Sequence, residues 1–187
     1  MSAISLQGNA GGTGTLTIAA PNTASNYTLT LPAETGTLYS STTPVRTQKG
    51  VPAFSANASA NQNVTSATWT KVSLQTEVFD VTAAFDNVTN YRFQPTVAGY
   101  YQINATGRSD GTSVSAVAFA VYKNGSQDWL VFSSGSSITQ ATFSGAKAMY
   151  LNGSTDYVEL WGQVTASSAA RFDSTASSLS GFLISAA

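Results

Sequence analysis

The chain has 187 residues, of which 42% are hydrophobic and only 9% are charged, so it can form a core but carries few ionic groups. Eight basic and nine acidic residues give a net charge of −1, which provides no electrostatic basis for binding nucleic acid or an anionic membrane. The absence of Cys and His excludes disulfides, thiolate nucleophiles, Cys/His metal sites and an imidazole general base. No apolar segment approaches the roughly 18 residues of a membrane span, so we expect no membrane insertion.

Residues 1–50 differ from the rest of the chain and predict an extended β-arm. They contain no Phe or Trp, and Glu34 is the only charged residue before Arg46. Leucine and isoleucine alternate there with threonine, at the period of two that is typical of short strands with one buried face. Proline and glycine separate three such strands, which are too short to bury a core of their own, so we expect the arm to dock on another chain. The residues assigned to this docking are Leu16, Ile18, Pro21, Asn22, Leu29, Leu31 and Leu38.

Residues 51–187 predict a separate head domain rich in β-strands. This part carries all nine Phe and all three Trp of the chain, which suffice for a packed core. Alternating segments are separated by turn pairs such as Asp110-Gly111 and Asn124-Gly125, and the second of these is the strongest hairpin signal. The expected strands are 67–74, 91–95, 99–107, 114–124, 129–134, 141–151, 156–164 and 178–185. Because no helical periodicity extends beyond a turn or two, the sequence predicts an all-β fold, a sandwich or a barrel.

Five segments of the head follow the motif order of a known family. They are 52–56 (PAFSA), 85–107, 121–125 (VYKNG), 151–160 and 180–184 (SGFLI). Phe93, Pro95, Gly99 and Tyr101 match the central block of that family at its spacing, whereas the glycine of the fourth block is displaced to Gly153. The head therefore resembles the jelly roll shared by complement-type globular domains and tumour-necrosis-factor-like proteins. This resemblance implies an antiparallel jelly-roll β-sandwich over residues 52–185 that assembles as a homotrimer.

The arm carries a resemblance of its own, in the segment 12–38. The matching residues are Leu16, Ile18, Ala20 to Thr23, Thr28 to Pro32 and Gly36 to Leu38. The segment is similar to one found near the start of many tailed-phage fibre and virion-surface proteins. The resemblance implies a structural protein of the bacteriophage particle surface, made in the host cytoplasm. Its arm would attach to the major capsid protein or another virion protein, and its head would project outward.

Two placements on the particle remain open. One is a capsid decoration protein or head fibre, which the short chain favours, and the other is a short tail fibre whose head is an adhesin for host-surface glycans. A glycan depolymerase is a remote third alternative, because glycoside cleavage needs two neighbouring carboxylates with separated pKa values. Asp156 and Glu159 lie three residues apart on an expected strand and so face opposite sides. We expect no enzyme activity and assign no catalytic residue, cofactor or metal.

Receptor contacts of the head, if it makes any, are expected from its connecting turns, because binding residues concentrate on loops held by a rigid scaffold. The candidates are Trp129, with Asp128 beside it, and Asp110. The alternative for Trp129 is that it follows the hairpin and packs inward. Asp110, Asp128 and Asp173 could meet around a cation, although solvated turn residues are the simpler interpretation.

The other aromatic residues have two interpretations as well. Phe93, Tyr100 and Tyr101 could form a platform for sugar rings, but alternating aromatics in a sandwich usually belong to the core or to a subunit interface. Trp69 and Trp161 could also stack on sugars, and a structural role is favoured for each.

Overall fold

The computed structural model describes Gly11, Ala24 and residues 51–135 and 138–187. Every regular element within these residues is a β-strand. In this described part, no helix is long and apolar enough to cross a membrane. The arm residues assigned to docking, from Leu16 to Leu38, lie outside the described residues. The arm and the domain boundary at residue 50 therefore stay predictions.

The described part of the head contains eleven strands, and every paired strand is antiparallel to its neighbour. Their bounds are β1 (Ala53–Asn57), β2 (Gln62–Asn63), β3 (Thr70–Lys71), β4 (Thr76–Asp80), β5 (Phe85–Asp86), β6 (Arg92–Phe93), β7 (Ala98–Lys123), β8 (Ser126–Ser134), β9 (Ile138–Asn152), β10 (Val158–Phe172) and β11 (Ser178–Ala186). The all-β class predicted from the sequence is confirmed.

The 26-residue strand β7 organises the head, because its two halves have different partners. The first half lies between β11 and β9, and the second half lies between β10 and β8. The change occurs between Asp110 and Val114, where the pairing with β9 shifts register and Ser113 has a φ of 51°. A residue in this left-handed region turns the chain sharply, so β7 passes there from one sheet to the other.

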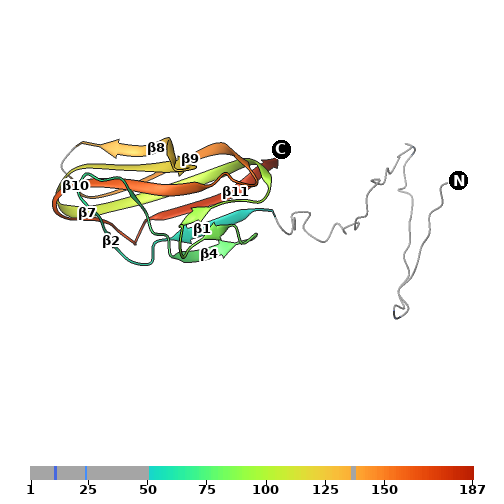
Figure 1. The fold of residues 1–187 in the computed structure, drawn as a ribbon, viewed down its shortest axis with the longest axis horizontal. Helices are drawn as coiled ribbons and strands as arrows, with labels where there is room; N and C mark the ends of the chain where they lie inside the picture. The colour runs from blue at the N-terminus through green and yellow to red at the C-terminus, as the bar shows by residue number, and fades with distance from the viewer. Residues whose placement is uncertain (1–10, 12–23, 25–50, 136–137) are drawn as a thin grey trace. The chain divides into compact units, whose positions relative to one another are not determined.

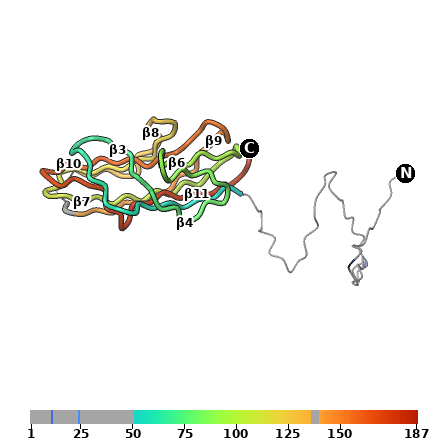
Figure 2. The backbone as a smooth tube through the Cα atoms, turned by 60° about the horizontal axis from the view of Figure 1, so that its bottom comes forward, coloured from blue at the N-terminus to red at the C-terminus, as the bar shows by residue number. Residues whose placement is uncertain are grey.

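The two sheets that share β7 form a sandwich. The first sheet has the order β4-β1-β11-β7-β9, and the second has β8-β7-β10, with β2, β3 and β6 along the far side of β10 and β5 beyond β6. Figure 1 shows β1, β4 and β11 on one side of the head and β8 on the other. In Figure 2 the corner of β7 lies at the end of the head opposite the C-terminus. This arrangement is the predicted antiparallel jelly roll.

Aromatic side chains fill the space between the sheets. Phe54 stacks on Phe93 with ring centroids 4.1 Å apart, and the ring of Tyr101 meets Phe93 edge-on at 5.7 Å. The Tyr101 hydroxyl donates to the Val97 carbonyl at 2.7 Å, and burial raises the pKa of Tyr101 to about 12. Phe93 and Tyr101 are therefore core residues, whereas Tyr100, one position away on β7, points outward and is exposed.

Most expected strands are present, with shifted bounds. Asn124 and Gly125 both have positive φ, 53° and 77°, as a two-residue hairpin turn requires, and they join β7 to β8 as predicted. The expected strands 99–107 and 114–124 are one strand, because Asp110-Gly111 forms a corner within β7 instead of ending it. The expected strand 67–74 is wrong for most of its length, since only β3 pairs regularly with β10 there.

Candidate interaction surface

The outer face of the first sheet exposes several large apolar side chains. Tyr100 on β7 is 55% exposed and Tyr150 on β9 is 41% exposed, and the two lie opposite each other with ring centroids 5.6 Å apart. Phe182 and Ile184 on β11 are 49% and 53% exposed. We call these four residues, with the outward positions of the strands between them, the neutral face. Apolar patches of this kind on a soluble domain mark interaction sites.

The neutral face carries no charged side chain. Strands β1 and β11 and residues 98–107 of β7 contain no Asp, Glu, Lys or Arg. The only charged residue of β9 is Lys147, whose ammonium group is held at 2.7 Å by Asp128 of β8, at the edge of the sandwich. Covering a surface without charges avoids the cost of taking ions out of water, so this face can be buried by a protein partner cheaply.

The outer side of the second sheet has the opposite character. Glu159 is 3% exposed, and it pairs with Lys71 at 2.6 Å and accepts a hydrogen bond from Trp161 Nε1 at 2.9 Å. Tyr122 stacks on Trp161 at 4.7 Å, and Trp69 lies 6.0 Å beyond Tyr122. These rings are half-buried and pack on one another, as the structural interpretation of Trp69 and Trp161 predicts. Both carboxylate oxygens of Glu159 thus have a partner within the head.

The hairpin residues nominated for receptor contact have partners within the head. Trp129 is half-buried and packs against the core, and its ring lies directly over Gly145 of β9, where an added Cβ would come within 2.7 Å of it. The inward alternative for Trp129 thus agrees with its packing. Asp128 is exposed and paired with Lys147. Contact of either residue with a receptor stays a prediction.

Asp110 lies far from that pair, in the corner of β7. Trp129 is paired with Val121, and from Val114 to Val121 alone β7 extends about 23 Å at about 3.3 Å per residue. The Asp110 carboxylate is bound by the Arg171 guanidinium, with Nε at 2.9 Å, and accepts from the Gly111 N–H at 2.8 Å. The structure therefore does not bring the three nominated residues into one site.

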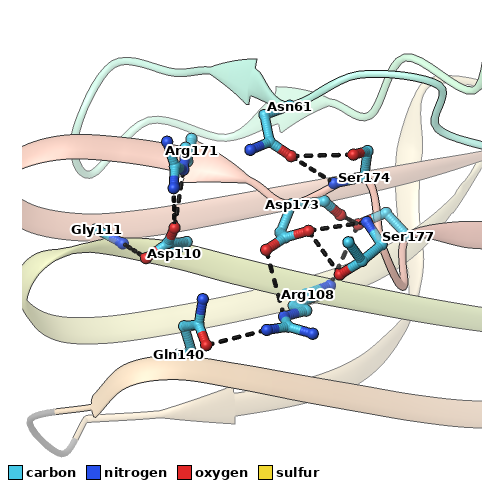
Figure 3. Close-up of polar contacts among 10 residues, drawn as sticks. Asn61, Arg108, Asp110, Gly111, Gln140, Arg171, Asp173, Ser174 and Ser177 are labelled. Carbon is cyan, nitrogen blue, oxygen red and sulfur yellow. Dashed lines mark hydrogen bonds and ion pairs between the residues drawn. The ribbon is translucent and has the colours of Figure 1, made fainter.

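Asp110 belongs to a group of charged side chains that we call the corner cluster: Arg108, Asp110, Arg171 and Asp173 (Figure 3). Arg108 Nε lies 3.4 Å from Asp173 Oδ2, an ion pair without a hydrogen bond, and its terminal nitrogen donates to Gln140 at 3.0 Å. The cluster ties the corner of β7 to the start of β9 and the end of β10.

Both carboxylates of the corner cluster already have an arginine partner and a backbone hydrogen bond. Asp173 accepts from the backbone N–H and hydroxyl of Thr175 at 2.8 and 2.7 Å. These bonds, the backbone one first, hold the pKa of Asp173 below its ordinary value. Asp128, the third residue considered for a cation, lies on β8 and pairs with Lys147 instead. No group of three metal-ligating side chains occurs among the described residues.

The other carboxylate weighed for catalysis, Asp156, closes the β7–β8 hairpin. It lies 2.9 Å from Lys123 and accepts from Asn124 Nδ2 at 2.7 Å. Asp156 and Glu159 thus serve separate ion pairs.

The sequence analysis did not predict the neutral face. Its signal, the lack of charged residues over 98–107 and 178–186, is nevertheless visible in the sequence.

Comparison with solved structures identifies the class of fold. The globular domain of zebrafish complement 1qA protein superposes with a TM-score of 0.54 at 20% identity, over 73% of this chain and 99% of that domain. Murine APRIL superposes with a TM-score of 0.52 at 10% identity, over 71% of this chain and 98% of that one. No family model matches the chain, and no curated protein matches its sequence. The likeness shows a jelly-roll β-sandwich shared with these proteins, which is the resemblance expected for the head.

Proposed function

We propose that this chain is a structural protein of a bacteriophage virion, a homotrimeric capsid decoration protein or head fibre. In this proposal the arm docks on the major capsid protein or another virion protein, and the head projects from the particle surface. The observation that carries the assembly is the neutral face. The virion role rests on the sequence of segment 12–38.

The neutral face supports a closed homo-oligomer on physical grounds. A surface without charge does not repel its copies, and the exposed rings of Tyr100, Tyr150 and Phe182 gain free energy when they are covered. A trimer closes by head-to-tail contacts, in which one patch meets a different patch of the next copy. Such an arrangement fits a jelly roll that presents a neutral face on one sheet and ion pairs elsewhere.

The arm supports attachment to a particle. Its short alternating segments are too small to fold alone, and extended segments of this kind add as strands to an exposed sheet edge of a partner. The partner supplies backbone hydrogen bonds, and alternate side chains such as Leu16, Ile18, Leu29 and Leu31 supply the apolar contacts. The low charge of the arm suits burial in a protein shell.

A short tail fibre that acts as an adhesin is the second candidate. The exposed Asp128 and Leu130 on β8, beside Trp129, favour it, because they form an accessible edge next to the hairpin. The remote depolymerase alternative lacks support in the described carboxylates Asp156 and Glu159, which both serve ion pairs.

Deletion of residues 1–40 tests the proposal. The truncated head is expected to stay folded and trimeric in light scattering at micromolar concentration but to be absent from purified particles, whereas the full chain is incorporated. Incorporation of the truncated protein would contradict the role of the arm, and a monomeric full-length chain would contradict the trimer. The number of copies per particle separates the placements, since hundreds indicate the capsid and a few dozen at most indicate the tail.

A further inference from the structure

An open cavity of about 400 Å³ lies where the loops between β4 and β7 meet the turn between β9 and β10. Its lining includes Asp86, Asn90, Arg92 and Gln94 from the first region and Ser154 from the turn. Most of these groups are polar, so the cavity is suited to a small hydrophilic ligand and not to an apolar one. The virion role proposed above does not depend on this cavity.

The cation in this cavity, Arg92, forms no ion pair with a carboxylate of the described residues. The Lys and Arg residues of the described part are Lys71, Arg92, Arg108, Lys123, Lys147 and Arg171. Each of these, except Arg92, forms an ion pair with a described carboxylate. An arginine without an acidic partner is a candidate for binding an anion from solution, because the guanidinium group is always charged.

The guanidinium group of Arg92 is nevertheless held in place. Its central carbon lies 4.3 Å from the ring centroid of Tyr157, and one terminal nitrogen donates to Gln94 Oε1 at 2.9 Å. Gln94 is fixed in turn, because its Nε2 donates to the Ser154 carbonyl at 2.9 Å. Within the described residues, no other hydrogen bond of the Arg92 side chain is present. A planar donor group fixed in this way is preorganised for a bidentate acceptor.

The natural counterion of Arg92 is engaged elsewhere. Asp86 lies directly opposite Arg92 in the β5–β6 pair, yet its carboxylate accepts from the backbone N–H groups of Val88, Thr89 and Asn90 at 3.0, 2.8 and 3.2 Å. The Asn90 side chain donates a fourth bond at 2.7 Å. These bonds, the one from Thr89 first, lower the pKa of Asp86 to about 2. The Asp86 carboxylate therefore shapes its own loop and forms no ion pair with Arg92.

The backbone around the cavity adopts sparsely populated conformations. Ala83 has a φ of 52° and Tyr91, between Asn90 and Arg92, has a φ of 49°. Gly153 has a φ of 69°, and a Cβ at that position would clash with the backbone of Val97 and Ala98. Left-handed alanine and tyrosine cost free energy that the surrounding structure must offset, and such residues concentrate at binding sites.

We propose that this cavity binds a small carboxylated sugar, with its carboxylate on Arg92. The guanidinium fork matches a carboxylate, and the amide of Asn90 and the hydroxyls of Thr96 and Ser154 offer partners for sugar hydroxyls. A phosphate ester carries close to two negative charges, which several cations usually share, whereas the cavity supplies Arg92 alone. A single-charge anion with neighbouring hydroxyl groups is therefore the better match.

Titration of the isotope-labelled full chain with galacturonate and with galactose tests the proposal by NMR. The two sugars differ only in the carboxylate. We expect galacturonate to shift the Arg92 side-chain N–H and the amides of Asn90 and Ser154 saturably, and galactose to leave them unchanged. Equal effects of the two sugars, or no saturable shift at tens of millimolar galacturonate, would overturn the proposal. Tighter binding of inorganic phosphate than of galacturonate would overturn the carboxylate class.

Substitutions distinguish specific binding in the cavity from nonspecific attraction of an anion to positive charge. Both Arg92→Gln and Arg92→Lys are expected to weaken galacturonate binding by about tenfold or more, because lysine keeps the charge but lacks the planar fork. The matched control Lys147→Gln removes one positive charge from β9 and is expected to leave the affinity for galacturonate unchanged. Thr96→Trp places a bulky ring at the cavity lining without replacing Arg92 and is expected to hinder binding sterically. Unchanged binding in folded Thr96→Trp, or equal weakening in Lys147→Gln, would refute the site.

Discussion

Replacement of Tyr150 by aspartate is the sharpest test of self-assembly through the neutral face. In an isolated head Tyr150 is already 41% exposed on β9, so a carboxylate there remains in water and the monomer is expected to keep its fold. In a trimer that buries the neutral face, the same carboxylate would be taken out of water against a neighbouring copy. The substitution is therefore expected to act on association and to leave the fold of each subunit intact.

The expected magnitude follows from the exposed area. A tyrosine side chain buries about 200 Å² when it is fully covered, so the exposed 41% of Tyr150 corresponds to about 80 Å². At about 25 cal/mol per Å², covering it contributes about 2 kcal/mol to each interface. The unpaired carboxylate adds a desolvation cost of several kcal/mol. Each interface would then be weakened by well over about thirtyfold, since each 1.4 kcal/mol or so is a factor of ten.

Sedimentation velocity at micromolar concentration measures the outcome. The wild-type chain is expected to sediment as a trimer and Tyr150→Asp as a monomer with an unchanged circular dichroism spectrum. Leu130→Asp is the matched control, because Leu130 is 43% exposed but lies on β8, at the edge of the second sheet. A trimeric Tyr150→Asp variant, or equal dissociation in Leu130→Asp, would show that the neutral face is not the interface.

Three further results are expected. Trp129→Ala should lower the free energy of unfolding by about 2–3 kcal/mol in urea titrations. This loss is smaller than for a fully buried tryptophan, because the ring packs over Gly145 while part of it stays in water. An unchanged free energy of unfolding together with lost cell binding would instead support receptor contact. Asp86 has its pKa lowered from 3.8 to about 2, so its stabilising effect is complete above pH 3.8 and is lost as the pH falls through about 2. Asp86→Asn should flatten that acid dependence, and an identical pH profile in the variant would refute the role of the loop hydrogen bonds. Trimer dissociation should change little between low and high salt because the neutral face has no charges, whereas strong dissociation by salt would point to an ionic interface.

Local chemistry made part of the fold predictable from the sequence. Asn124-Gly125 is a turn wherever it follows an alternating segment, because both residues tolerate positive φ. Phe93, Tyr100 and Tyr101 were expected in the core or at a subunit interface, and the structure places Phe93 and Tyr101 in the core and leaves Tyr100 exposed. The corner of β7 was not predictable, because Asp110-Gly111 has the chemistry of a turn and only the pairing with β9 and β10 keeps the strand continuous.

The candidate sites depended more on long-range contacts. Two contacts of the cavity join segments that are about sixty residues apart: the stacking of Arg92 on Tyr157 and the hydrogen bond from Gln94 to Ser154. No local sequence pattern predicts contacts of this kind. Arg92 stands out only when every other described cation is found to have an acidic partner. Trp129 was nominated because of its position after a turn, but the bulged pairing of β8 with β7 directs its ring onto Gly145.

The placement of charged residues in this head is not explained by the stability of the jelly roll alone. Outward positions of antiparallel strands normally face water and carry polar or charged residues, and charges at exposed strands also protect against unwanted association. Here the ion pairs of the described residues lie on the second sheet, in the corner cluster, at the hairpin and between β8 and β9, and Lys71, Arg171 and Lys123 each have a carboxylate partner. Strands β1, β9 and β11 and residues 98–107 of β7 instead direct uncharged side chains outward, and the exposed Glu77 lies apart from them on the edge strand β4. Core stability does not require that choice, because these side chains point away from the core. It is explained if this face is covered by protein in the working assembly, where a charge would have no partner and a neutral side chain needs none.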